Sequence, residues 1–493
     1  MDNNFKKEYL KKIDEVISNG NFKDTWESLS QYEVPQWYKD AKFGIFIHWG
    51  IYSVPAFYSE WYSRNMYMKG SLAYFYHLYK YGKHKEFGYK DFIPMFKAEN
   101  YNSDEWAQLF KESGAEYVVP VAEHHDGFQM YKSEISHWNA YEMGPCKDTL
   151  GMLTKSVNNL NLISGCSSHR IEHWFFMGHG RELESDIPDN MVEGDFYYPA
   201  HKEADSQDLF SEPIPDKEFL EDWLVRCCEL VDNYNPKIFY FDWWIQHSAA
   251  KPYLKKFAAY YYNRATERNQ GVVINYKHDA FMFGTAVVDI ERGQFKDAKP
   301  YIWQTDTAVA RNSWCYTKYN FYKPASEIIC SLIDVVSKNG RMLLNIGPKA
   351  DGTIPHKDKD ILLKIGKWLR VNGEAIYGSK VWRFSGEGPT GASEGQGSDL
   401  RGIRYTKHDF RFTVKGDCIY AFALKYPKNQ KITIKSFAIA DASKLSVFNG
   451  IIKNVSVLGF DDEIKYSRDK RGLHIKTNNV KSDYPVVFKI EMM

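Results

Sequence analysis

The sequence is poor in cysteine and contains no long apolar run. Its 7 cysteines are an odd number, scattered through 493 residues without a C-x-x-C pair, which argues against a disulfide framework or a structural zinc site. No run of roughly 18 apolar residues occurs, so no membrane span is expected. Residues 1–22 also lack the continuous apolar stretch of a signal peptide. These features predict a reduced, cytoplasmic protein that does not associate with membranes.

An excess of charge of either sign is also missing. The chain has 64 Lys and Arg against 63 Asp and Glu, a net charge of +1, so no nucleic acid or anionic surface is expected as a partner. Aromatic residues, by contrast, make up 16% of the chain. Such rings either build a large core or line a groove for sugars, whose apolar faces pack against them.

Short apolar runs that end in polar residues dominate the first three quarters of the chain. Runs of this kind are typical of strands buried on both faces, as in a parallel sheet. They alternate with helical patterns, for which we expect Ser103 to be an N-cap, and the alternation predicts a (β/α)8-like barrel. Residues 301–305 are the candidate eighth strand. The other seven runs are Phe43–Trp49, Tyr117–Glu123, Leu162–His169, Lys237–Asp242, Val272–Tyr276, Val287–Glu291 and Met342–Ile346.

The pattern changes after residue 378. Residues 386–400 are rich in Gly and Ser and predict a linker or a long loop. Short alternating runs follow, which predict an antiparallel β-sandwich. We therefore divide the chain into a lead-in (1–35), a catalytic barrel (36–382) and a sandwich (383–493). The expected sandwich strands are Asp409–Lys415, Cys418–Leu424, Lys431–Ser436, Leu445–Phe448, Ile464–Ser467, Leu473–Lys476 and Pro485–Ile490.

Two carboxylates end predicted barrel strands. Asp242 follows the run KIFYF and Glu291 ends VVDIE, and residues at these ends point into a barrel's active site. Such a pair suits glycosidic cleavage, with one nucleophile and one proton donor. The alternatives are a helix cap for Asp242, an ion pair with Arg292 for Glu291, or a metal site.

Histidines lie at the C-terminal ends of three other predicted strands: His48, His124, His125 and His169. Neutral imidazoles both donate and accept hydrogen bonds, which suits sugar hydroxyls. No H-E-x-x-H or other ligand spacing supports a metal, so we expect neither a metal nor a cofactor.

Several segments resemble the α-L-fucosidases of glycoside hydrolase family 29, over about residues 25–382. They are WYKDAKFGIFIHWGIYSVPAFYSEWY (37–62), YVVPVAEHHDGF (117–128), IFYFDWW (238–244), DIERG (289–293), RNSWCY (311–316) and NGRMLLNIGPKADGTIP (339–355). The resemblance implies a retaining enzyme with Asp242 as nucleophile. It further implies fucose-binding residues at His48, Glu60, Trp61, His124 and His125. The aromatic pocket for the fucose methyl group would be formed by Phe46, Tyr58, Tyr240 and Trp314.

The acid/base position varies within this family. Glu291 is the best match, and Glu172 is its rival. Where many members have a Tyr-Tyr-Ser strand end, this chain has Ser167-Ser168-His169, and Lys277 stands where an Arg is often found. We count His169 and Lys277 among the expected substrate-binding residues.

The sequence thus predicts a retaining α-L-fucosidase that acts on a fucosylated oligosaccharide or glycoconjugate. The alternatives are a related hydrolase that prefers a galactoside-like sugar, and a fucose-binding protein without catalysis. A homo-oligomer is left open, as are the natural glycan and its linkage.

Overall fold

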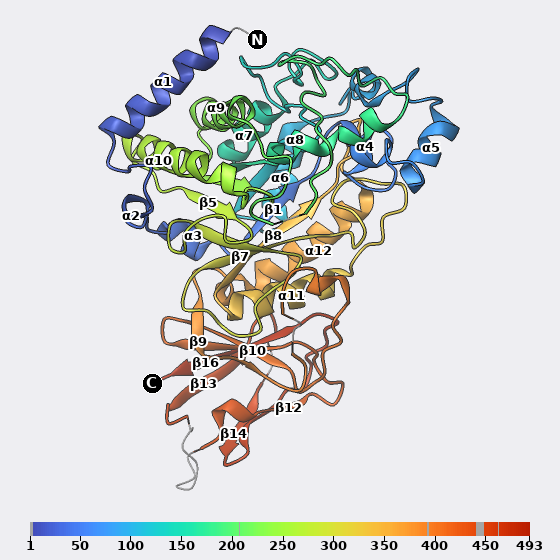
Figure 1. Ribbon diagram of the computed structural model, residues 1–493. Coiled ribbons are helices and arrows are strands. Elements are labelled where there is room, and N and C mark those ends of the chain that lie inside the picture. The colour runs from blue at the N-terminus through green and yellow to red at the C-terminus, as the bar shows by residue number, and fades with distance from the viewer. Residues whose placement is uncertain (1–2, 207, 392–393, 440–447, 462) are drawn as a thin grey trace.

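A computed structural model shows a barrel with a smaller β domain attached to one side (Figure 1). It describes residues 3–206, 208–391, 394–439, 448–461 and 463–493. Within this part of the chain, no helix is long and apolar enough to cross a membrane.

Eight parallel strands close into a barrel in sequence order, as predicted. Their side chains are almost entirely buried, which explains the near-continuous apolar runs in the sequence. The strands are β1 (Phe43–Ile47), β2 (Tyr117–Glu123), β3 (Ile163–Ser168), β4 (Ile238–Phe241), β5 (Val273–Tyr276), β6 (Val287–Glu291), β7 (Trp303–Ala308) and β8 (Gly340–Ile346).

Helices cover most of the barrel's outside, and their ends follow local capping chemistry. The side chain of Asn102 accepts hydrogen bonds from the amides of Asp104 and Glu105, so Asn102, and not Ser103, is the N-cap of α6. Asp216 caps α9 in the same way. The helices are α1 (Asn3–Asn19), α2 (Trp26–Leu29), α3 (Gln36–Asp40), α4 (Tyr62–Asn65), α5 (Leu72–Lys80), α6 (Ser103–Glu112), α7 (Thr149–Asn159), α8 (His173–Phe176), α9 (Lys217–Tyr234), α10 (Lys251–Glu267), α11 (Ala325–Ser337) and α12 (His356–Asn372).

The helical layer is interrupted beside β6. Residues 277–286 and 292–302, which connect β5 to β6 and β6 to β7, contain no helix. The segments 51–102 and 170–215, by contrast, are long βα insertions with short helices of their own. The barrel mouth is therefore built up on one side and left open beside β6.

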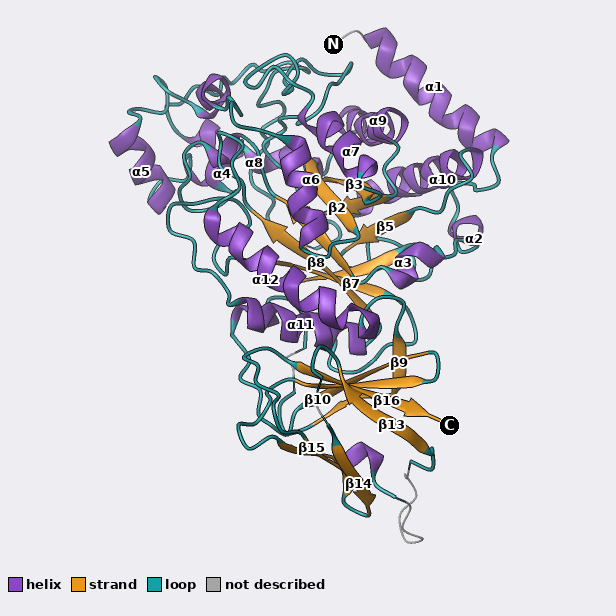
Figure 2. Cartoon of the chain, turned by 180° about the vertical axis from the view of Figure 1, so that it is seen from behind, coloured by secondary structure: helices purple, strands orange, loops and turns teal. Residues whose placement is uncertain are grey.

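Two antiparallel sheets form the C-terminal domain, in the strand orders β13-β16-β11-β10-β9 and β12-β15-β14. Apolar residues of both sheets share one core, so the predicted sandwich is confirmed (Figure 2). The strands are β9 (Lys380–Glu387), β10 (Phe410–Lys415), β11 (Cys418–Ala423), β12 (Lys431–Ile434), β13 (Ile452–Val457), β14 (Lys465–Asp469), β15 (Gly472–Lys476) and β16 (Val486–Met492).

Two of these strands, β9 and β13, were not expected from the sequence. The expected junction at residues 382/383 lies inside β9. The segment 386–400 begins at the end of this strand, and its described residues continue without a strand to a short 3-10 helix at Ser398–Leu400. The expected strand Leu445–Phe448 falls mostly outside the described residues.

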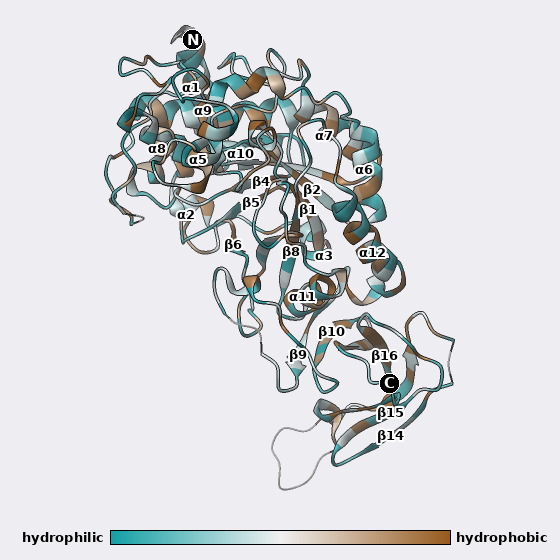
Figure 3. Cartoon of the chain, turned by 90° about the vertical axis from the view of Figure 1, so that its right-hand side faces the viewer, coloured by the Kyte–Doolittle hydropathy of each residue, from teal (hydrophilic) through white to brown (hydrophobic). Residues whose placement is uncertain are grey.

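Helix α11 lies between the two domains and contacts both (Figure 3). It packs against β8 of the barrel on one side and against β9 and β10 of the sandwich on the other. Its Asp334, fully buried, pairs with Lys338 and with Arg411 of β10. At the other end of the chain, α1 of the lead-in lies on α9 and α10, where Tyr9 donates a hydrogen bond to Asp232.

Candidate active site

The C-terminal ends of the barrel strands enclose a cavity of about 410 Å³. Barrel enzymes carry their active sites at this end. The cavity brings together all of the expected site residues except Tyr58: Phe46, His48, Glu60, Trp61, His124, His125, His169, Tyr240, Asp242, Lys277, Glu291 and Trp314. Asp242, Glu291 and the histidines therefore converge as the strand-end argument predicted, and the residues implied by the family resemblance lie with them.

Asp242, directly after β4, is held as an anion. Its Oδ2 accepts a hydrogen bond from Nδ1 of His169 (2.8 Å), and Oδ1 accepts one from Nζ of Lys277 (3.1 Å). Burial alone would favour the protonated acid. The positive charge of Lys277 and the hydrogen bonds from His169 and His125 outweigh it and hold the pKa of Asp242 well below its usual range.

Glu291, the last residue of β6, has the opposite tendency. Burial and the charges of Asp306 and Asp242 raise its pKa above the ordinary value, against the opposing charge of Lys277. Its side chain keeps 20% exposure. A carboxyl group in this setting holds a proton more readily than a free one and remains accessible to a ligand.

One lysine joins the two carboxylates. Nζ of Lys277 lies 3.1 Å from Oδ1 of Asp242 and 3.0 Å from Oε2 of Glu291. These two oxygens are therefore at most about 6 Å apart, which agrees with the separation of about 5–5.5 Å between carboxyl groups in retaining glycosidases.

Lys277 also contacts a third carboxylate, Asp306 of β7, at 3.4 Å. Burial opposes the charge of Lys277, but Asp306, Glu291 and Asp242 raise its pKa well above the ordinary value, so it stays protonated. Burial and the neighbouring Asp306 raise the pKa of Asp289 well above its usual range. The lysine is thus the cation that allows several acids to share one buried site.

Two of the histidines, His48 and His124, form a neutral, polar part of the cavity wall. Burial lowers the pKa values of His48 and His124 well below the usual range. Nδ1 of His48 is bonded to Oδ1 of Asn345 (2.7 Å), while Nδ1 of His124 is buried and has no hydrogen-bond partner among the residues that the structure describes. Unused imidazole nitrogens in a cavity are suited to sugar hydroxyls.

The same histidines are the residues that could hold a metal. One nitrogen from each of His48, His124 and His169 lies within 4.8 Å of the others. The ring nitrogens of His169 are already bonded, to Ser167 (2.9 Å) and to Asp242. A metal would have to displace one of these bonds, so the set fits a hydrogen-bonding network better than a ligand cage.

Aromatic rings line the cavity directly beside these histidines, with the ring of His48 4.7 Å from that of Phe46 and 5.3 Å from that of Trp314. The ring of Phe46 lies 4.9 Å from that of Tyr240 and 6.3 Å from that of Trp314. Glu60 fixes Trp314 by accepting a hydrogen bond from its backbone N–H (3.0 Å). Tyr58 does not join this wall, because it is 48% exposed and lines an adjoining outer cavity.

Glu172, the rival acid/base, lies behind the cavity wall. It is fully buried and does not line the cavity, and its Oε2 is 3.1 Å from Nδ1 of His125. Burial raises the pKa of Glu172 to about 8. Although burial opposes it, the charges of Glu172 and Asp242 raise the pKa of His125 to about 9. The pair therefore places a second positive charge beside Asp242, whose Oδ2 is 3.5 Å from Nε2 of His125.

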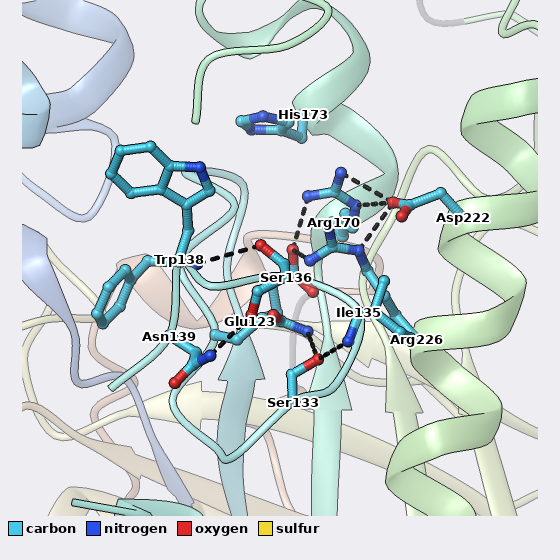
Figure 4. Close-up of polar contacts among 12 residues, drawn as sticks. Glu123, Ser133, Ile135, Ser136, Trp138, Asn139, Arg170, His173, Asp222 and Arg226 are labelled. Carbon is cyan, nitrogen blue, oxygen red and sulfur yellow. Dashed lines mark hydrogen bonds and ion pairs between the residues drawn. The ribbon is translucent and has the colours of Figure 1, made fainter. Parts of the chain in front are cut away.

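A buried ion-pair network supports the strand ends that carry these histidines (Figure 4). Arg170, just after β3, contacts Glu123 of β2 (2.7 Å) and Asp222 of α9 (3.0 Å). Arg226 contacts the same two acids, at 3.3 and 2.8 Å. With two charges of each sign, the network ties β2, β3 and α9 together. Glu123 directly precedes His124, and Arg170 directly follows His169.

Four residues of the cavity were missed by the sequence reasoning: Trp243, His278, Asp306 and Gln396. Trp243 and His278 each follow a recognised residue by one position, so a wider window would have included them. Asp306 lies one residue beyond the expected strand 301–305. Gln396 comes from the Gly-rich segment, where no local signal marks it.

Comparisons with known proteins agree with this geometry. The family model "Alpha-L-fucosidase" matches residues 9–374, and "Alpha-L-fucosidase C-terminal domain" matches residues 401–491. An α-L-fucosidase of Dictyostelium discoideum is 33% identical, over 75% of this chain and 77% of its own. The plasma α-L-fucosidase of Homo sapiens is 30% identical, over 83% of this chain and 80% of its own.

Solved structures agree as well. The Thermotoga maritima α-fucosidase in complex with fucose has a TM-score of 0.73 and 29% identity, covering 95% of this chain and 100% of that one. A Thermotoga maritima α-L-fucosynthase, in complex with α-L-Fuc-(1-2)-β-L-Fuc-N3, gives a TM-score of 0.73 at 28% identity, covering 96% of this chain and 100% of that one. By its sequence and its fold, this chain belongs to the α-L-fucosidase family.

Proposed function

We propose that this α-L-fucosidase hydrolyses terminal α-L-fucosides by double displacement, with Asp242 as nucleophile and Glu291 as acid/base. The observation that carries these assignments is the shared Lys277. Its Nζ contacts both carboxylates in one cavity, which limits their separation to a range compatible with a retaining pair. Their surroundings shift the two pKa values in opposite directions.

In the first step, a carboxylate oxygen of Asp242 attacks the anomeric carbon as the glycosidic bond breaks. Glu291 gives its proton to the departing oxygen, which leaves as an alcohol. In the second step, the Glu291 carboxylate takes a proton from water, and the water oxygen attacks the anomeric carbon. The bond to Asp242 breaks, which releases fucose and restores both side chains.

Lys277 fits both steps. Its positive charge stabilises the Asp242 anion before attack and the Glu291 anion after proton donation. Because the lysine is buried and held by Asp306, it needs no reorganisation as negative charge moves from one carboxylate to the other.

Recognition of fucose is assigned to the two walls of the cavity. His48, His124 and Glu60 offer polar atoms for the ring hydroxyls. Phe46, Tyr240 and Trp314 offer an apolar surface for the methyl group, and burial of one methyl contributes about 0.8 kcal/mol. An L-galactoside carries a hydroxymethyl group at the same position and would bury a hydroxyl against the rings.

Glu291 suits the role of proton donor better than Glu172. The exposed edge of Glu291 faces the cavity, whereas Glu172 is buried against His125 and does not line the cavity. We assign Glu172 instead to positioning His125, whose Nδ1 lies 3.1 Å from Oε2 of Glu172.

Replacing the nucleophile tests the proposal. Asp242→Gly should lower turnover of an aryl α-L-fucoside by several orders of magnitude, and added azide should restore cleavage with formation of a β-fucosyl azide. Asp189→Gly is the matched control, because that carboxylate is 92% exposed and lies outside the cavity. Undiminished turnover in Asp242→Gly would refute the assignment. Cleavage of an aryl galactoside in preference to the fucoside would refute the role of the methyl pocket.

A cytoplasmic location is also part of the proposal, supported by seven unpaired cysteines, of which five are buried. Cell fractionation tests it. The expected partner is a fucosylated oligosaccharide or glycoconjugate.

A further inference from the structure

A segment from beyond the barrel returns to the active site. Residues 394–400 follow β9 in the sequence, yet their backbone runs along the end of β6. The amide of Gly397 donates to the carbonyl of Glu291 (3.0 Å), and that of Asp399 donates to the carbonyl of Arg292 (2.9 Å). Gly395 forms a β-bridge with Gln294. The segment thus covers the part of the mouth where the helical layer is interrupted.

A buried charge anchors the segment on its far side. Oδ2 of Asp399 pairs with Nζ of Lys323 at 2.6 Å and accepts a hydrogen bond from Thr307 of β7. The lysine side chain is only 4% exposed and also donates to Thr307 (2.7 Å). A charge-assisted pair with little access to water keeps one geometry better than a surface contact does, so residues 394–400 have a fixed position relative to β6 and β7.

In this position, the segment places the polar side chain of Gln396 next to the carboxyl group of Glu291. Nε2 of Gln396 lies 3.3 Å from Oε2 of Glu291, and Gln396 lines the cavity. Lys277 donates to the same oxygen. Because both donors form hydrogen bonds to Oε2, the proton of the protonated Glu291 side chain is expected on Oε1.

The segment also borders the route out of the cavity. An outer cavity of about 780 Å³ adjoins the sugar cavity, and Glu60, Trp61 and Trp314 line both. Leu400, which is 48% exposed, lines the outer cavity. Gln396 and Leu400 therefore face consecutive parts of one path, from the acid/base outward.

We propose that residues 394–400 complete the leaving-group side of the active site, and that Gln396 is a positioning residue that holds the acid/base carboxyl with Oε1 toward the glycosidic oxygen. This inference rests on the proposed function, because it requires Glu291 to be the proton donor. Gln396 itself takes no part in bond making; it acts through Glu291.

A leaving-group comparison separates positioning from structural support. Fucosyl fluoride or a dinitrophenyl fucoside needs little proton donation, whereas a fucosylated disaccharide depends on it. Gln396→Ala should lower kcat/KM about tenfold for the disaccharide, as expected for loss of one hydrogen bond to a charged group, and leave the activated substrates within about twofold. Asp399→Asn, which weakens the anchor, should show the same selectivity. Glu394→Gln, an exposed residue of the same segment that does not line the cavity, is the matched control.

The pH profile gives a second measure. Donation by the Gln396 amide favours the anionic form of Glu291, so its removal should move the basic limb of kcat/KM to higher pH. Equal losses on both substrate types, or no loss on the disaccharide, would overturn the inference while the proposed function stands. Wild-type protein that cleaves neither substrate would overturn the proposed function, and this inference with it.

Discussion

Lys277 is the residue on which the charge balance of the active site depends, and Lys277→Met tests that role. Its Nζ lies 3.0–3.4 Å from oxygens of Asp242, Glu291 and Asp306. A unit charge about 3 Å away, at an effective dielectric constant near 20, interacts by roughly 5 kcal/mol. The cost of burying the lysine offsets part of this, and a pKa change of about 1–3 units per carboxyl is the expected net effect.

The direction follows from the sign of the charge. The ammonium favours the ionised form of each carboxyl, so its removal raises the pKa values of Asp242 and Glu291. Activity needs Asp242 ionised and Glu291 protonated. The acidic limb of the kcat/KM profile should therefore move up by about 1–3 pH units, and the basic limb should move up with it. The assay is the pH dependence of aryl fucoside hydrolysis, followed beside thermal unfolding.

A second buried lysine provides the control. Lys338 pairs with Asp334 at 2.7 Å and is only 3% exposed, but it precedes β8 and so lies at the opposite end of the barrel. The control variant is Lys338→Met. Lys277→Met and Lys338→Met each remove one partner of a buried ion pair and should destabilise the fold by about 3–5 kcal/mol. Only Lys277→Met should shift the acidic and basic limbs of the kcat/KM profile. Limbs that do not shift, or that shift equally in both variants, would refute the reasoning.

Three further outcomes are expected. Glu172→Gln should lower the pKa of His125 from about 9, measured by NMR titration of the ring; an unchanged titration would show that Glu172 does not hold that charge. Trp314→Ala should reduce the preference for an aryl fucoside over the galactoside by about fivefold, because methyl contacts worth about 1 kcal/mol are lost; an unchanged kcat/KM ratio would contradict the methyl pocket. Dialysis against a chelator should leave kcat/KM unchanged, because a metal would have to displace a bond of His169; activity lost on dialysis and restored by a divalent metal would contradict the hydrogen-bonding network.

The barrel was predictable because its strands are buried on both faces. Runs such as Tyr117–Glu123 are largely apolar until the point where the chain emerges at the mouth, and polar residues follow there. This rule located Asp242, Glu291 and the histidines from sequence alone. It fell short at β7, where polar residues inside the barrel interrupt the apolar pattern and the expected strand stopped one residue before Asp306.

The rest depends on contacts between distant parts of the chain. Gln396 lies 105 positions from Glu291, in a Gly-rich segment whose composition indicates only a loop. Its place at the mouth follows from the missing helices beside β6 and from the Asp399–Lys323 pair, which no local pattern encodes. Glu172 was visible as a carboxylate near a strand end, but only the structure shows it behind the wall, against His125.

The most direct test of the central claim is to trap the enzyme with a 2-fluoro-fucosyl fluoride and map the labelled peptide. The account predicts one fucosyl adduct per chain, on the peptide that contains Asp242, with activity lost at the same rate as the label is gained. Label on Glu291 or Glu172, or complete inactivation without any covalent adduct, would contradict it.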